Sequence, residues 1–318
     1  MKKISVQKVS DAAQNVWVEH LSPDWFLPYL QLSRWDRPIG WWLLLIPCWW
    51  GLLLAINATN EPRIFDLWIL IGCFLGAVLM RGAGCTWNDL TDHHLDALVA
   101  RTQSRPLPSG RVSRQNAYLW LGVQSLLATL ILFTFNFFTI LIGLISLIPV
   151  IIYPFAKRFT WWPQIFLGIA FNWGALVGWS AHTGSLDLPP LLLYGAGIMW
   201  TIFYDTIYAH QDRTDDIISG IKSTALLFGS HTKLWLGVFG ILTVLLLGGA
   251  ILASWNWQFF NPISLIITLT SLFLFAGHLI WQLKKLNINS PEICLSVFRS
   301  NRDCGLLIAF GLALAIVF

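Results

Sequence analysis

Long apolar segments alternate with short polar ones from residue 39 to the end of the chain. Each apolar run has about 20 residues, which as a helix is long enough to cross a hydrocarbon core of roughly 30 Å. No polar block between them is large enough to fold as a domain of its own. The pattern predicts an all-α integral membrane domain over residues 39–318 with nine transmembrane helices. Their expected positions are 39–58, 65–86, 116–135, 137–156, 164–182, 190–210, 233–254, 262–282 and 305–318.

The first 38 residues are polar, and no apolar core precedes Ile39. We therefore expect no cleaved secretory signal here. Apolar residues recur at helical spacing between Val9 and Trp17, which favours a short amphipathic helix lying on the membrane surface. Residues 1–38 are predicted to form a cytoplasmic N-terminal segment.

Composition and charge agree with a membrane protein. The chain is 56% hydrophobic and only 11% charged, whereas soluble domains carry about a quarter charged residues. Every Lys and Arg except Arg63 falls in the N-terminal segment, in the connections after the even-numbered predicted helices or, for Arg81 and Lys233, near the ends of the helices next to these connections. Because cytoplasmic loops carry the excess of basic residues, these connections are predicted to be cytoplasmic. The expected partner of this basic charge is the lipid bilayer, with no nucleic acid.

Two acidic motifs follow long apolar runs on this predicted cytoplasmic side. The first reads N-D-L-T-D-H-H-L-D over residues 88–96. If residues 80–98 form one helix, Asn88, Asp92 and Asp96 lie on one face. Like charges four residues apart repel and weaken a helix, so the motif is typical of a site that binds a cation.

The second motif lies between residues 204 and 216, where Asp205, Asp212 and Asp216 are spaced by seven and four residues. This spacing predicts a second stripe on a helix face. Oxygen ligands without thiolates suit Mg²⁺, which one or two carboxylates and substrate phosphates typically hold. We therefore expect Mg²⁺ between the two motifs and a diphosphate.

Other side chains near the motifs have two readings. The basic ones can neutralise phosphate charge or anchor the chain at the membrane interface. The tyrosines can face a cationic intermediate through their rings or pack in the core. The candidates for substrate binding are Arg101, Arg105, Lys157, Lys222, Tyr153, Tyr204 and Tyr208, and Arg158 is a candidate for catalysis.

Four segments together carry a resemblance to a known family. They read N-D-x-x-D-x-x-x-D at 88–96, R-P-L-P-S-G at 105–110, Y-P-F-A-K-R at 153–158, and a second aspartate motif that continues to G-I-K-S-T-A over 204–225. The chain thus resembles the membrane-embedded aromatic prenyltransferases of the UbiA type, and within them those that act on 4-hydroxybenzoate.

The resemblance implies a nine-helix membrane bundle with a cytoplasmic cap of loops and short helices. It also implies Mg²⁺ bridging a polyprenyl diphosphate, with Arg158 near the diphosphate. The metal ligands that it implies are Asn88, Asp92, Asp96, Asp212 and Asp216. The implied reaction prenylates 4-hydroxybenzoate next to its hydroxyl, a step in ubiquinone biosynthesis. We expect a bacterial inner membrane with the active site facing the cytoplasm.

Three further roles complete this hypothesis. Asp205, or the released diphosphate, is expected to remove the ring proton. Asp92, Asp96, Asp212 and Asp216 are expected to act in catalysis through the metal. The acceptor carboxylate needs a cation, for which Arg81 is the first candidate because it lies seven residues before Asn88. Arg34 and Arg37 are the alternatives.

Three other functions remain open. The same chemistry on another ring, such as homogentisate, a naphthoate or a porphyrin side chain, fits the second motif less well. An ion-coupled transporter would show acidic residues or helix breaks near mid-span, whereas these stripes lie at span ends. A CDP-alcohol phosphotransferase would carry a D-G-x-x-A-R segment, which this sequence lacks.

Overall fold

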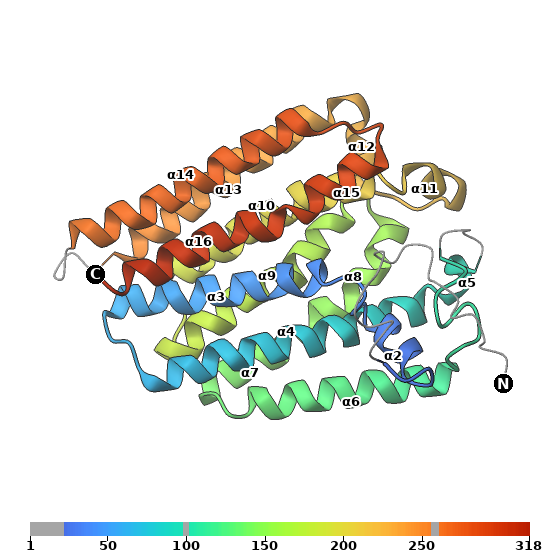
Figure 1. Ribbon diagram of the computed structural model, residues 1–318, viewed down its shortest axis with the longest axis horizontal. Helices are drawn as coiled ribbons and strands as arrows, with labels where there is room; N and C mark the ends of the chain where they lie inside the picture. Colours follow the sequence, from blue (N-terminus) through green and yellow to red (C-terminus); the bar gives the residue numbers. More distant parts are fainter. Residues whose placement is uncertain (1–21, 98–101, 256–260) are drawn as a thin grey trace. The chain divides into compact units, whose positions relative to one another are not determined.

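The computed structural model describes residues 22–97, 102–255 and 261–318, and every regular element in them is a helix (Figure 1). The predicted N-terminal amphipathic helix lies outside these residues. The elements are α2 (Leu27–Leu32), α3 (Ile39–Thr59), α4 (Ile64–Thr91), α5 (His93–Asp96), α6 (Arg114–Leu132), α7 (Phe137–Ile145), α8 (Leu147–Phe159), α9 (Pro163–Thr183), α10 (Leu188–Ala209), α11 (Arg213–Ser219), α12 (Thr224–Phe228), the 3₁₀ turn η1 (Gly229–His231), α13 (Thr232–Ser254), α14 (Pro262–Lys285), α15 (Pro291–Arg299) and α16 (Asn301–Ala315).

Each of the nine predicted segments falls on a helix, but the fourth is not continuous. α7 and α8 are separated at Ser146. Pro149 follows three residues later and has no N–H to donate to the carbonyl of Ile145, so the helical ladder is interrupted there. Five stretches of the described chain are long and apolar enough to cross a membrane: Ile39–Thr59, Ile64–Thr91, Phe137–Phe159, Thr224–Ser254 and Pro262–Lys285.

The chain divides into two compact units, each made of two separate stretches of sequence. Unit 1 comprises residues 1–41 and 75–131, and unit 2 comprises residues 42–74 and 132–318. The first acidic motif therefore belongs to unit 1 and the second to unit 2.

Unit 1 is held together by a small apolar core between α2, the C-terminal half of α4 and α6. Its buried members are Leu32, Leu90, Leu107, Val112 and Ala117. Because Leu90 immediately follows the first two motif residues, packing of this core fixes the end of α4. The segment after α5 is fixed as well, since Leu107 and Val112 are 2% and 3% exposed.

Unit 2 is a larger bundle in which α10 packs between α9 and α13, and α14 packs against α13 and α16. α3 approaches α9 so closely that a Cβ at Gly178 would collide with the carbonyl oxygen of Cys48, and a Cβ at Gly51 with that of Ala175. Gly174 and Gly178 have the four-residue spacing of small residues that lets membrane helices approach each other.

Buried tryptophans join α3, α10 and the C-terminal helices in unit 2. The rings of Trp50 and Trp200 stack with centroids 5.0 Å apart. The Trp50 indole N–H donates to the carbonyl of Gly305 at 2.9 Å, and that of Trp200 to Asn301 Oδ1 at 3.0 Å. These polar contacts orient the rings, since a buried indole N–H requires an acceptor. The five cysteines are free and buried.

Candidate active site

The first acidic motif lies where α4 passes into α5. The face shared by Asn88, Asp92 and Asp96 was inferred on the condition that residues 80–98 form one helix. In the described residues α4 ends at Thr91 and α5 begins at His93. The helical hydrogen bonds nevertheless continue from Asp92 N to Asn88 O at 2.9 Å and from Asp96 N to Asp92 O at 2.8 Å. The motif residues therefore keep a spacing of one helical turn along the backbone.

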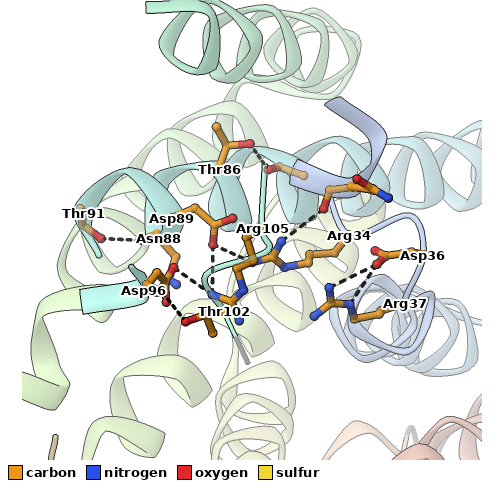
Figure 2. Close-up of polar contacts among 12 residues, drawn as sticks. Arg34, Asp36, Arg37, Thr86, Asn88, Asp89, Thr91, Asp96, Thr102 and Arg105 are labelled. Atoms are coloured by element: carbon orange, nitrogen blue, oxygen red, sulfur yellow. Dashed lines mark hydrogen bonds and ion pairs between the residues drawn. The ribbon is translucent and has the colours of Figure 1, made fainter. Parts of the chain in front are cut away.

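Asp89, which the sequence analysis did not single out, is the centre of the ion pairs in unit 1 (Figure 2). Its Oδ1 lies 2.6 Å from Arg34 Nη2 and 3.5 Å from Arg105 Nη1. Arg105 Nη1 also lies 3.0 Å from Asp96 Oδ2. Asp89 is fully buried and Arg34 is 6% exposed, so this is an ion pair removed from solvent. The sequence signal that could have identified Asp89 is the presence of a carboxylate next to Asn88 in a chain with few charged residues.

The backbone at Arg34 is arranged for this contact. Trp35 N bonds to Leu30 O at 3.1 Å, and Arg34 N bonds to Gln31 O at 3.1 Å, which is the Schellman pattern at the end of α2. Arg34 occupies the left-handed position with φ of 59°, where glycine is usual. A side chain at this position costs about 1 kcal/mol relative to glycine. The ion pair with Asp89 gives a physical reason for an arginine there.

The segment after α5 is tied to the first motif by side-chain contacts. Thr102 Oγ1 donates to the carbonyl of Asp96 at 2.7 Å. Arg111 donates to the carbonyl of Ser104 at 2.7 Å and to Gln31 Oε1 at 2.7 Å, so it joins this segment to α2. Burial lowers the pKa of Arg111, but a guanidinium stays protonated at neutral pH.

The three arginines proposed for the acceptor carboxylate have different surroundings in unit 1. Arg34 is bonded to Asp89, as described. Arg37 donates from Nε and Nη2 to Asp36 Oδ2, both at 3.2 Å. Arg81, on α4, lies against Gly40 of α3, where an added Cβ would collide with its guanidinium. Arg101 lies outside the described residues.

The second motif does not form the continuous stripe expected from its spacing. α10 ends at Ala209 and α11 begins at Arg213, so Asp205 and Asp212 do not share one helix. The N–H groups of His210, Gln211 and Asp212 bond three residues back, at 3.0–3.3 Å, which tightens the end of α10.

Asp212 then serves as the residue before α11, and Asp216 N bonds to Asp212 O at 2.8 Å. Asp212 and Asp216 thus keep a spacing of one turn, while Asp205 lies one element earlier, on α10. The spacing of seven failed as a predictor because residues 210–212, which lie between the helices, bond three residues back and belong to neither helix.

Unit 2 brings together three of the predicted basic residues at the end of α8. Lys222 N donates to the carbonyl of Lys157 at 3.1 Å. The Lys222 ammonium donates to the carbonyl of Phe159 at 3.4 Å and lies 5.8 Å from the centre of the Trp161 ring. The Arg158 guanidinium lies 5.3 Å from the Phe155 ring. The K-R pair and the G-I-K-S segment, more than 60 residues apart in sequence, therefore meet through their backbones at the end of α8.

The predicted tyrosines differ in burial. Tyr204 is 1% exposed and its hydroxyl lies 2.9 Å from Thr201 Oγ1, within the aromatic core of unit 2. Tyr208 is partly buried, and its ring lies 4.7 Å from that of Phe298. Tyr153 is partly buried on α8.

The donor atoms of the two motifs fit Mg²⁺ in kind. Asn88, Asp92, Asp96, Asp212 and Asp216 offer amide and carboxylate oxygens, the hard ligands that this ion prefers. Neither unit alone places three carboxylate, imidazole or thiolate side chains close together among its described residues. This is compatible with Mg²⁺, which retains water and takes substrate phosphates as ligands.

Solved structures of UbiA homologues share this fold. A UbiA homologue from Aeropyrum pernix K1 matches with a TM-score of 0.67 at 22% identity, covering 86% of this chain and 96% of that one. A UbiA homologue from Archaeoglobus fulgidus bound to DMAPP and Mg²⁺ matches with a TM-score of 0.66 at 21% identity, covering 91% and 99%.

Curated relatives are much more similar in sequence. The mitochondrial 4-hydroxybenzoate polyprenyltransferase of Bos taurus is 47% identical over 90% of this chain and 75% of its own length. The protein of the same name from Aedes aegypti is 45% identical over 92% of this chain, which spans 64% of that relative. The model of the UbiA prenyltransferase family matches residues 44–315. The chain belongs to the UbiA prenyltransferase family.

Proposed function

We propose that this protein transfers a polyprenyl group from polyprenyl diphosphate to 4-hydroxybenzoate, at the carbon next to the hydroxyl, as a step in ubiquinone biosynthesis. The observation that carries the proposal is a sequence identity of 43–47%, over at least 90% of this chain, to proteins that are named 4-hydroxybenzoate polyprenyltransferases. Both acidic motifs lie within the matched family region.

All nine apolar segments cross the membrane in this proposal, and the N-terminus and both motifs face the cytoplasm of a bacterial inner membrane. The distribution of basic residues supports this orientation, because the positive-inside rule places them on the cytoplasmic side. The matched relatives are named as mitochondrial proteins.

The two motifs serve one diphosphate. Asn88, Asp92 and Asp96 in the first, with Asp212 and Asp216 in the second, hold Mg²⁺. When bound, this ion stabilises the negative charge that develops on the leaving diphosphate. The remaining phosphate charge is neutralised by basic side chains, for which Arg101, Arg105, Lys157, Arg158 and Lys222 are the candidates.

Arg81 binds the carboxylate of the aromatic acceptor. It lies on α4, two turns before Asn88, and Gly40 leaves room for its guanidinium. Arg34 is a poorer candidate, because its charge is already paired with a buried carboxylate. Asp205 accepts the ring proton after the new carbon–carbon bond has formed, and Tyr208 presents its ring to the allylic cation.

The experiment that tests this function uses membranes containing the protein, radiolabelled 4-hydroxybenzoate, a polyprenyl diphosphate and Mg²⁺. A lipid-extractable product that disappears with EDTA is expected. Homogentisate and a dihydroxynaphthoate are supplied in parallel, and preferential labelling of either would contradict the acceptor assignment.

Replacement of a metal-binding aspartate gives the sharpest prediction. Asp92→Ala and Asp212→Ala are each expected to lower turnover by at least about 100-fold, because charge stabilisation of the leaving group is lost. Arg302→Gln, which changes an exposed residue of α16, serves as the control for expression. Near-normal turnover of either aspartate variant would contradict the metal role.

A further inference from the structure

The Ser223 hydroxyl is a buried polar group with no partner. Ser223 is 3% exposed, and its Oγ accepts and donates no hydrogen bond among the described residues. It lies in unit 2, in the turn between α11 and α12. A buried hydroxyl left without a partner costs about 1–3 kcal/mol. Ser223 also lies in the G-I-K-S-T-A segment that continues the second acidic motif, so its unpartnered hydroxyl indicates a functional role.

Local structure does not use this hydroxyl. Ser223 has the extended backbone of a residue preceding a helix, with φ of −150° and ψ of 157°, yet its side chain caps no N–H of α12. Serine at such a position ordinarily accepts a hydrogen bond from the second or third helical N–H. The side chain is therefore directed away from the role that its place in the chain offers.

The residues on both sides of Ser223 are firmly bonded. Lys222 N donates to the carbonyl of Lys157 at 3.1 Å, and Thr224 N donates to Gln164 Oε1 at 3.2 Å. The Thr224 hydroxyl lies 2.6 Å from Thr206 Oγ1 on α10. The backbone that carries Ser223 is thus held by α8, α9 and α10, and rotation about one side-chain torsion is enough to re-aim its hydroxyl.

The surroundings of Ser223 favour an anionic ligand. Its neighbour Lys222 is bonded through its backbone to Lys157, which precedes Arg158 at the end of α8, and Ile221 N donates to the carbonyl of Asp216 at 3.0 Å. The hydroxyl therefore lies in the short segment that connects the carboxylates of α11 to the basic end of α8. A phosphate group bound between these carboxylates and the basic end of α8 would offer an oxygen that accepts a hydrogen bond from the serine O–H.

We propose that the Ser223 hydroxyl donates a hydrogen bond to the diphosphate of the prenyl donor, and that Ser223 is a substrate-binding residue of this chain. The proposal rests on the function proposed above. It explains why the side chain neither caps α12 nor pairs with a neighbour: its acceptor arrives with the substrate.

The test compares Ser223→Ala with the parent protein. Binding of inorganic pyrophosphate with Mg²⁺ is followed by the shift in apparent Tm, without turnover, and the KM values for polyprenyl diphosphate and for 4-hydroxybenzoate are measured separately. The variant is expected to have an unchanged or higher Tm without ligand, because an unsatisfied hydroxyl has been removed. Its KM for the diphosphate is expected to rise about 10-fold, the effect of one hydrogen bond to a charged group.

The same variant is expected to lose most of the pyrophosphate-induced Tm shift while its KM for 4-hydroxybenzoate stays unchanged. Ser223→Thr keeps a hydroxyl and is expected to retain more of the shift than Ser223→Ala. Ser230→Ala, at an exposed serine of η1, is the matched control and should behave as the parent.

An unchanged pyrophosphate shift and unchanged KM in Ser223→Ala would overturn the proposal. Loss of folding in that variant would overturn it too, because the hydroxyl would then support the fold. The proposed function fails differently: the parent protein would show the pyrophosphate shift but transfer no prenyl group to 4-hydroxybenzoate. A parent protein without any pyrophosphate shift would contradict the ligand proposed for Ser223.

Discussion

A buried carboxylate lies near each end of α4, and the two ends stabilise it by different means. Asp66 lies in the first turn and is 5% exposed, while Asp89 lies in the last turn and is fully buried. Both occur in a helix of low charge, where an unpaired carboxylate is costly. The contrast shows how the direction of one helix decides what kind of partner an acid requires.

At the N-terminal end, in unit 2, the helix itself helps. Asp66 Oδ2 accepts a hydrogen bond from Arg63 N at 2.7 Å, and the positive end of the helix dipole favours the carboxylate. Its Oδ1 lies 2.8 Å from His182 Nδ1, and His182 Nε2 lies 2.8 Å from Thr59 Oγ1. At this end of the helix, a backbone N–H and a histidine side chain are sufficient to stabilise the buried carboxylate.

At the C-terminal end, in unit 1, the dipole opposes a negative charge. Asp89 Oδ1 is correspondingly approached by two guanidinium groups, those of Arg34 and Arg105. One of these arginines sits in a left-handed backbone conformation to make the contact. The acid at the unfavourable helix end has permanent cations, whereas the acid at the favourable end has a histidine and a backbone N–H.

The largest effect is expected from Asp89→Asn. The change leaves Arg34 buried beside a neutral group, and breaking a buried ion pair in this way costs about 3–5 kcal/mol. Unfolding in mixed micelles with increasing SDS measures the loss. Arg302→Gln is the matched control, because its ion pair with Asp303 is about half exposed and contributes about 0–1 kcal/mol. A loss no larger than that of the control would remove the distinction between the two ends of α4.

Asp66→Asn is expected to destabilise unit 2 less, by about 1–2 kcal/mol. Asparagine keeps an acceptor for Arg63 N and loses only the charge near the helix dipole and its bond to His182. The same SDS titration gives the value. A loss equal to that of Asp89→Asn would mean that the helix dipole does not distinguish the two acids.

The smallest expected effect is the difference in stability between two variants of Arg34. It separates the cost of the left-handed backbone from the loss of the side chain. Arg34→Ala and Arg34→Gly both remove the ion pair with Asp89, but only glycine adopts φ of 59° without strain. The glycine variant is expected to be more stable than the alanine variant by about 1 kcal/mol in the same titration. Equal stabilities would show that the left-handed backbone at the end of α2 carries little strain.

The sequence by itself determined the all-α class, the position of each apolar segment and the residues of the two acidic motifs. The physical reason is that a membrane acts on every helix locally, since each segment must satisfy its own backbone and present about 20 apolar residues. The motif aspartates were found for the same reason, because carboxylates are rare at the ends of such segments.

The tertiary structure alone decided which charges meet. Arg34 and Asp89 are 55 residues apart, and nothing in their local sequence indicates that one pairs with the other. The position of the Ser223 hydroxyl also depends on distant residues, because Lys157 and Gln164 accept hydrogen bonds from the backbone on either side of it. Helical periodicity is a local property that can be read along the chain, whereas partner choice depends on which helices pack together.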